Sequence, residues 1–296
     1  MKRKAIKQGL GSLTMSLPNK WVKKNNITAG TDLQVEEQEK TLIISPEKIK
    51  VSKTFEINAT TKKLMTNRTI QSAYNQGFDE IKINYDDPRV LSKVKKVADE
   101  LIGFELIEET NKFCILKELT GIQQLEFDSI FRRLFRIING MAEEGLTAIT
   151  EKNKAGLDNV IIRDLEVNKF SNLCIRYLNK LGHPIFERTS VHIIICHNLE
   201  IIADGYKELF TYTKDSNKDT KTYIPLIQKI NELFSKCYEF TFKPTDQKAN
   251  ETAEQYEQLK KEIENTKYKD DKIMNILRKI LNFTITLQGI QMTYSK

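Results

Sequence analysis

The stretch GSLTMSLPNKWVKKNNITAGTDLQVEEQEKTLIISP, residues 11–46, contains strand, helix and turn signals in close succession. Its first part, SLTMSLP, alternates apolar and polar residues, which predicts a half-buried strand. The glycines before it favour a tight turn after another short strand around residues 4–8. Pro18 suits the first turn of a short helix over NKWVKKNNI, and LQVEE and TLIIS predict a hairpin that ends at Pro46. The order expected for residues 1–50 is therefore strand, strand, short helix, strand, strand.

The excess positive charge of the chain is concentrated in its first residues. The chain has 296 residues, with 47 Lys and Arg against 40 Asp and Glu, and a formal net charge of +7. Seven basic residues precede Asp32, the first acidic residue, so the rest of the chain is balanced. A local basic surface is typical of a protein that meets a polyanion, either nucleic acid or an anionic membrane. The alternative is a frayed, solvated terminus. The residues that we expect to contact a polyanion are Lys2, Arg3, Lys4, Lys7, Lys20, Lys23 and Lys24.

Residues 11–46 resemble the SpoVT/AbrB swapped-hairpin DNA-binding domain in their order of elements and in a turn that reads Ile27, Gly30, Thr31 and Asp32. The resemblance implies that two chains interleave their hairpins into one β-barrel, so that the protein is a homodimer that binds double-stranded DNA. Physical reasoning agrees only that a partner surface is needed, since about 50 residues bury too little surface to be stable alone. The residues that we expect to face the partner chain or the shared barrel are Leu13, Met15, Leu17, Val35, Leu42 and Ile44.

The composition is that of a globular protein of two or three domains, with 40% hydrophobic and 29% charged residues. No apolar run approaches the roughly 20 residues that a membrane span needs, and the N-terminus has no apolar signal-peptide core. We therefore expect a cytoplasmic protein without membrane insertion. The cysteines lack a C-x-x-C pattern, which favours buried free thiols over a disulfide framework or a zinc site. They are Cys114, Cys174, Cys196 and Cys237.

Residues 51–120 alternate between strand and helix patterns and predict a small α/β domain. The expected order is a strand at TFEIN, a helix that ends near Gly77, a strand at EIKINY, a helix between Pro88 and Gly103, and a final hairpin. This domain shows no phosphate-loop glycine spacing and no catalytic constellation, so we assign it a regulatory or spacer role.

Residues 121–296 change to long helical patterns with short polar loops, which predict an antiparallel helical bundle. The bundle divides into two three-helix units, about 123–213 and 222–294, which indicates an internal repeat. The fold class is therefore multidomain α+β, with domains at 1–50, 51–120 and 121–296. The helices are expected at about 123–150, 156–182, 188–213, 222–241, 246–267 and 270–294.

The helical region resembles PhoU-like domains, which are paired three-helix bundles found in regulators of phosphate uptake. The match consists of RDLEVNKFSNLCIRYL, residues 163–178, and VHIIICHNLEIIADGYKEL, residues 191–209. The resemblance implies a divalent or iron-type metal ion in the first unit, held by Glu200 and Asp204, which lie one turn apart on one helix face. The further ligands that we consider are Asp164, Glu166 and His197.

An ordinary polar helix face, or an ion pair with Lys207, is the alternative interpretation of Glu200 and Asp204. The second unit has Asn282 and Thr286 in the two corresponding positions. Neither side chain carries a charge, so we expect no metal ion there.

The sequence contains no Ser-His-Asp context, no H-E-x-x-H motif and no phosphate loop, so we expect no enzyme and no catalytic residues. A swapped-hairpin domain joined to a PhoU-like bundle is similar to a group of archaeal proteins described as phosphate uptake regulators. That similarity implies a dimeric DNA-binding transcriptional regulator linked to phosphate uptake or signalling. The alternative is a signalling adaptor whose bundle binds a phosphate transporter or sensor protein, with the hairpin domain as a dimer clamp and no DNA role.

Overall fold

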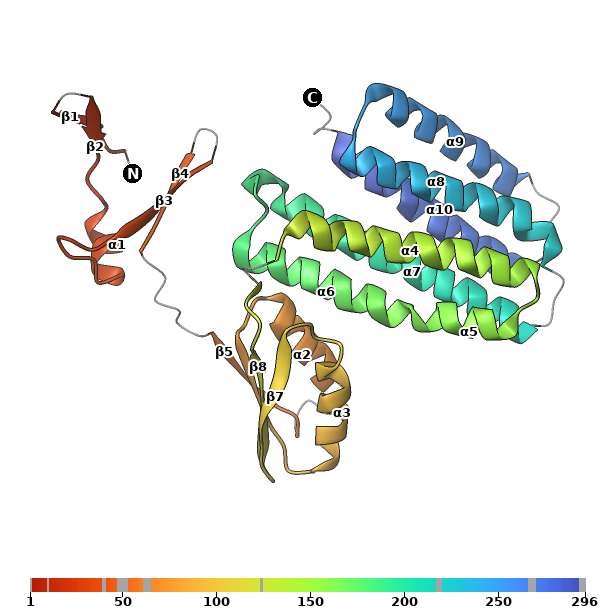
Figure 1. Cartoon of the computed structure of the whole chain (residues 1–296), viewed down its shortest axis with the longest axis horizontal. Helices are drawn as coiled ribbons and strands as arrows, with labels where there is room; N and C mark the ends of the chain where they lie inside the picture. Colours follow the sequence, from red (N-terminus) through yellow and green to blue (C-terminus); the bar gives the residue numbers. More distant parts are fainter. Residues whose placement is uncertain are drawn as a thin grey trace. The chain divides into compact units, whose positions relative to one another are not determined.

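The computed structural model of the chain describes residues 2–9, 11–38, 41–46, 53–60, 65–122, 125–216, 220–265 and 270–292. The chain divides into two compact units, Met1–Ser52 and Lys53–Lys296 (Figure 1). The domain boundary predicted at residue 50 lies outside the described residues. In the part of the chain that is described, no helix is both long enough and apolar enough to span a membrane.

The first unit contains five elements in the order that the sequence predicts. Its two hairpins are antiparallel and a short helix lies between them in the chain. The elements are β1 (Ile6–Gln8), β2 (Ser12–Thr14), α1 (Asn19–Lys24), β3 (Leu33–Gln38) and β4 (Thr41–Pro46).

Backbone conformation explains where the elements of the first unit end. Gly9 and Gly11, between β1 and β2, have φ angles of 73° and 99°, which glycine adopts without strain. Helix α1 ends at Lys24 and not at Ile27 as expected. Asn26 has a φ angle of 53°, in the left-handed region that commonly ends helices.

Residues 53–122 form the predicted small α/β domain. Its elements are β5 (Thr54–Asn58), α2 (Thr66–Asn75), β6 (Glu80–Asn84), α3 (Arg89–Ala98), β7 (Phe104–Glu109) and β8 (Phe113–Glu118). The four strands form one mixed sheet in the order β5-β6-β8-β7, in which β5 and β6 are parallel and β8 is antiparallel to both neighbours. Both helices cover the same face of the sheet (Figure 1).

The two faces of this sheet have different chemistry. On the uncovered face, the ammonium nitrogens of Lys82 and Lys117 lie 3.4 Å from carboxylate oxygens of Glu56 and Glu80. The covered face supplies the core of the domain, as the period-two alternation of the strands requires. Its buried strand residues are Ile57, Ile81, Ile83, Cys114 and Leu116.

The rest of the described chain is helical. The helices are α4 (Phe127–Thr150), α5 (Lys154–Ile162), α6 (Asp164–Leu181), α7 (Thr189–Ser216), α8 (Ile224–Phe242), α9 (Asp246–Glu264) and α10 (Asp271–Gln291). One continuous hydrophobic core includes residues from all of them. The two predicted three-helix units therefore share a core. Helices α7 and α10 pack closely, because a Cβ atom at Gly205 would lie 2.7 Å from Cγ1 of Ile280.

The prediction of one helix over residues 156–182 is wrong, because Arg163 interrupts it between α5 and α6. The Arg163 amide donates to the carbonyl of Val160, three residues back instead of four, at 3.1 Å. The Arg163 guanidinium also donates to both carboxylate oxygens of Glu144 in α4, at 2.7 and 2.5 Å. This bidentate pair anchors the junction of α5 and α6 to the neighbouring helix.

All four cysteines are free and buried, as predicted. Cys114 lies in the sheet, and Cys174, Cys196 and Cys237 lie in the core of the helices. Burial raises the pKa of Cys114 to about 11 and that of Cys237 to about 12, and it raises the pKa of Cys174 as well. These three thiols are therefore protonated at neutral pH.

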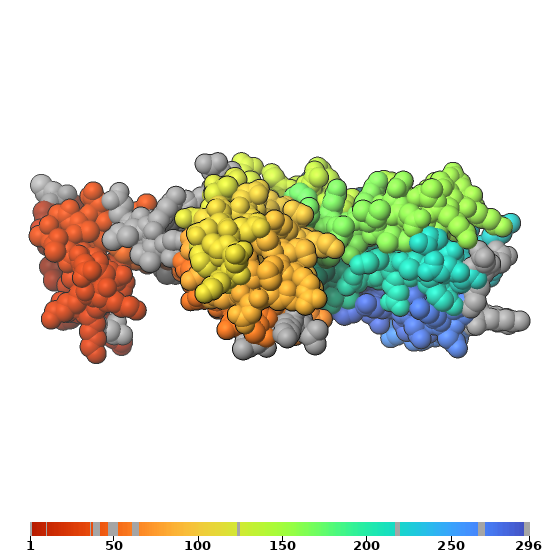
Figure 2. All heavy atoms as spheres, turned by 90° about the horizontal axis from the view of Figure 1, so that it is seen from below, coloured from red at the N-terminus to blue at the C-terminus, as the bar shows by residue number. Residues whose placement is uncertain are grey.

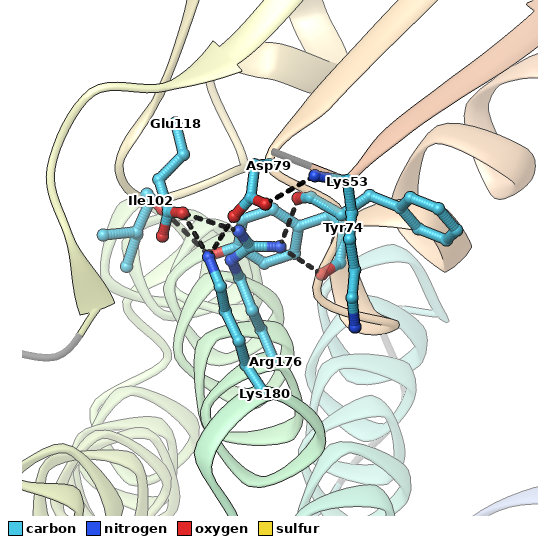
Figure 3. A network of polar contacts seen from close by, with 8 residues as sticks. Lys53, Tyr74, Asp79, Ile102, Glu118, Arg176 and Lys180 are labelled. Carbon is cyan, nitrogen blue, oxygen red and sulfur yellow. Dashed lines mark hydrogen bonds and ion pairs between the residues drawn. The ribbon is translucent and has the colours of Figure 1, made fainter. Parts of the chain in front are cut away.

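A buried arginine joins the α/β domain to the helices (Figure 3). Arg176 of α6 is 1% exposed, and its Nη1 donates to the carbonyl oxygens of Tyr74 at 2.7 Å and Phe78 at 2.8 Å. Its Nη2 lies 3.1 Å from a carboxylate oxygen of Glu118. The guanidinium carbon is 4.8 Å from the ring centres of Tyr74 and Phe104, a distance at which cation–π attraction operates.

Further polar contacts surround this arginine. The ammonium group of Lys180 pairs with Asp79 and with Glu118, which also binds Arg176. Asp79 accepts from the backbone amide of Lys53 at 2.8 Å (Figure 3). The α/β domain and the helices form one continuous surface in the space-filling view (Figure 2), in agreement with their grouping in one compact unit.

We expect Arg176→Ala to lower the free energy of unfolding by about 3–5 kcal/mol, because it leaves two carbonyl groups without their donor and leaves Glu118 with Lys180 alone as its cation. Arg136→Ala, at an exposed position of α4, is the matched control and should change it by less than about 0.5 kcal/mol. Urea denaturation followed by circular dichroism measures both. Equal stability of the two variants would contradict the structural role of Arg176.

Candidate nucleic-acid interface

The basic residues predicted to contact a polyanion all lie on the surface of the first unit. Each is exposed, and none forms an ion pair with another residue in the part of the chain that the structure describes. They occupy the segment before β1, β1 itself and α1. In that order they are Lys2, Arg3, Lys4, Lys7, Lys20, Lys23 and Lys24.

Local structure fixes where three of these cations lie. Lys7 of β1 is paired with Leu13 of β2, so the two side chains lie on the same face of the hairpin. Lys23 and Lys24 lie in the last turn of α1, where the helix dipole favours positive charge. The cations of the helix therefore also stabilise its end.

The first unit has no interior of its own. Among its described residues, no side chain is buried. In the second hairpin Val35 is paired with Ile44, which puts Leu33, Val35, Leu42 and Ile44 on one face, while Ile43 lies on the other. Val35 is 60% exposed, Leu42 62% and Leu13 69%. An isolated two-stranded hairpin is marginally stable in water, so this apolar face needs a partner surface.

The residues expected to face a partner chain are therefore available for such a contact. Leu13, Met15, Val35 and Leu42 are exposed, and Leu17 and Ile44 are half-buried.

The metal-ligand candidates lie on α6 and α7. Asp164, Glu200 and Asp204 are close enough for their charges to interact. Burial raises the pKa of Glu200 and of Asp204, and the charge of Asp164 acts in the same direction on both. Glu166 is exposed, and Nδ1 of His197 lies 3.8 Å from the Glu200 carboxylate.

A lysine supplies the cation next to Asp164. The Asp164 side chain is 2% exposed, and the ammonium nitrogen of Lys207 lies 2.5 Å from its Oδ2. Among the described residues, no three His, Cys, Asp or Glu side chains are grouped so that they could hold a metal ion. Lys207 therefore pairs with Asp164, whereas the alternative interpretation paired it with Glu200 or Asp204. In the second three-helix unit, Asn282 and Thr286 are exposed.

Sequence patterns missed two polar features of the second unit. Arg176 lies in residues 163–178, where the sequence indicated only the carboxylates Asp164 and Glu166 as functional candidates. Its carbonyl partners are 102 and 98 residues away in the chain. Its position three residues after the buried Leu173, on an apolar helix face, was the available signal. The rings of His183 and His192 stack with centroids 4.3 Å apart, and no spacing rule predicts that contact.

Comparison with known proteins finds one family that the first unit resembles. Residues 6–52 match the family model described as antidote-toxin recognition MazE, bacterial antitoxin. No curated protein matches the chain. The N-terminal unit is therefore similar to an antitoxin domain, a similarity that fits both its basic surface and its need for a partner.

We expect Lys207→Met to lower the free energy of unfolding by about 1.5–3 kcal/mol, because Asp164 stays buried without its cation. The double variant Asp164→Asn/Lys207→Met should recover most of the loss, since no charge is then left unpaired. Thermal denaturation with and without EDTA measures both effects. If EDTA lowers the melting temperature of the unmodified protein, a metal ion contributes to its stability and the ion-pair interpretation is wrong.

Proposed function

We propose that the protein is a homodimeric DNA-binding transcriptional regulator and not an enzyme. The proposal depends on one observation. Exposed cations, an exposed apolar face and a match to an antitoxin family occur together in the first unit. In this proposal the unit joins two chains and grips DNA, and the second unit receives a signal linked to phosphate uptake.

A second copy of the chain is the partner that best suits the apolar face. The face consists of short hairpins with strand edges, which another hairpin of the same kind can cover by pairing and packing. The swapped-hairpin barrel implied by the resemblance to SpoVT/AbrB domains is one such arrangement. It doubles the number of cations on one particle.

The cations suit the phosphate backbone better than base edges. Six of the seven are lysines, whose ammonium groups act as point charges and do not read guanine in a bidentate way. Counterion release then supplies most of the affinity. Arg3 is the one candidate for a base contact, so the proposed protein has modest sequence specificity.

The link to phosphate is supported by the resemblance of residues 163–178 and 191–209 to PhoU-like helices. The second candidate function is a signalling adaptor whose helices bind a phosphate transporter or sensor protein, with the first unit as a dimer clamp. The similarity to the antidote-toxin recognition family favours a role of the first unit in protein recognition.

We expect the full chain to have the molar mass of a dimer in light scattering, and Val35→Asp to shift it toward the monomer. A carboxylate in the apolar face would have to be buried without a partner, which costs several kcal/mol. Gln34→Asp, on the other face of the same strand, is the matched control and should leave the dimer intact. A monomeric unmodified protein, or a Val35→Asp dimer as tight as the control, would exclude this interface.

DNA binding should weaken steeply with salt. If a dimer contacts six to ten phosphates, affinity for a labelled duplex falls about 10³–10⁵-fold between 50 and 200 mM salt. Lys4→Glu/Lys7→Glu should weaken binding of all duplexes equally, because phosphate contacts carry no sequence information. Lys93→Glu/Lys96→Glu, exposed on α3, makes the same change of charge outside the first unit and serves as the control in fluorescence anisotropy. Equal losses in both variants, or no binding at low salt, would favour the adaptor.

A further inference from the structure

A cavity of about 640 Å³ lies at one end of the helices and is lined by residues of the second unit. It forms where α4 begins, where the chain passes from α6 to α7, and where α8 and α10 end. Figure 1 shows the start of α4 beside the connection between α6 and α7. Cavities of roughly 300–1,000 Å³ are typical of small-molecule sites.

Flat side chains form much of the cavity wall. Phe127 and Phe131 are buried and stack with ring centroids 5.3 Å apart. The Phe242 ring lies next to them, with its centroid 5.7 Å from that of Phe131, and the guanidinium carbon of Arg132 lies 3.7 Å from its centre. Such walls favour a ligand with a flat ring.

A pair of neutral histidines adds a further flat surface. The rings of His183 and His192 are 4.3 Å apart and nearly parallel, with an interplanar angle of 24°. Nδ1 of His183 lies 2.9 Å from the amide nitrogen of Ile185 and 3.1 Å from the carbonyl oxygen of the same residue, so this ring is held by the backbone. His192 donates from Nδ1 to the carbonyl of Arg188 at 2.9 Å, so its Nε2 is an acceptor. Burial lowers the pKa of His192 to about 4 and lowers that of His183, so both rings are neutral at pH 7.

A buried donor without a partner points to the polar part of the ligand. Gln291 lines the cavity, is 8% exposed, and its amide nitrogen has no hydrogen-bond partner among the described residues. An unsatisfied buried donor is costly and uncommon in folded proteins. Arg132 and Arg188 also line the cavity, and both are partly buried.

The charged groups around the cavity differ in exposure. The carboxylates that line it, Glu126 and Asp128, are exposed, whereas Arg132 and Arg188 are half-buried and Gln291 is buried. The first turn of α4 adds the positive end of a 24-residue helix. An acceptor with negative charge therefore suits the inner part of the cavity.

We propose that this cavity binds a small organic anion with a flat ring, whose ring lies on the histidine pair and the phenylalanines while its anionic oxygens accept from Gln291 and the arginines. Inorganic phosphate is too small to contact both the aromatic rings and the donors of the cavity. A phosphate ester and a carboxylate present the same anionic oxygens. The proposal does not depend on DNA binding by the first unit.

Isothermal titration calorimetry on the full chain tests the proposal with four compounds. Adenosine 5′-monophosphate and 2-naphthoate are ring-bearing anions with different head groups, adenosine lacks the charge, and orthophosphate lacks the ring. We expect at least one ring-bearing anion to bind with a dissociation constant of about 1 mM or below. Adenosine and orthophosphate should bind at least about tenfold more weakly, since each lacks one of the two kinds of contact.

Two cavity variants and one control variant locate the binding. Gln291→Glu keeps the shape of the side chain but replaces the donor with a charged acceptor. It should raise the dissociation constant of the ring-bearing anion by about tenfold or more. Gln258→Glu, exposed on α9, makes the same change of charge elsewhere and should bind like the unmodified protein. His183→Ala, which removes one ring of the pair, should also weaken binding. The proposal is overturned if neither ring-bearing anion binds, if orthophosphate binds as tightly as they do, or if Gln291→Glu binds unchanged.

Discussion

A guanidinium group cannot be buried without partners, and this constraint governs the second unit. Removing an arginine from water is costly, and only fixed hydrogen bonds and an opposite charge offset that cost. Arg176 finds them on the α/β domain, in the carbonyls of Tyr74 and Phe78 and in the carboxylate of Glu118. If the domain separated from α6, those partners would be lost together. The sheet and the helices therefore behave as one body.

The first unit shows the reverse situation. It has elements with clear local signals, but none of its described side chains is fully buried. Its local structure is specified by glycines, a proline and alternation, while its stability has to come from another molecule. A unit of this kind is suited to assembly, because its fold and its association are the same event.

Local signals predicted most of the elements, and contacts distant in sequence account for the errors. Alternation and turn residues indicated both hairpins of the first unit and the strands and helices of the α/β domain. Periodicity could not show the interruption at Arg163, because the apolar pattern continues across it and the Arg163 side chain binds Glu144 on another helix. The carboxylate motif indicated a metal ion. Whether Lys207 or a metal ion lies beside Asp164 depends on how α6 and α7 pack. The stacking of His183 on His192 likewise depends on how the chain turns between these helices.

The buried cysteines make the folded protein a poor target for thiol oxidation and alkylation. All four thiols are shielded, and the raised pKa values keep three of them protonated. A thiol reagent therefore reacts only with molecules in which the core has opened. Cys114 reports opening of the sheet, and Cys174, Cys196 and Cys237 report opening of the helices. The chain thus carries internal labels that distinguish local from global unfolding without any engineered change.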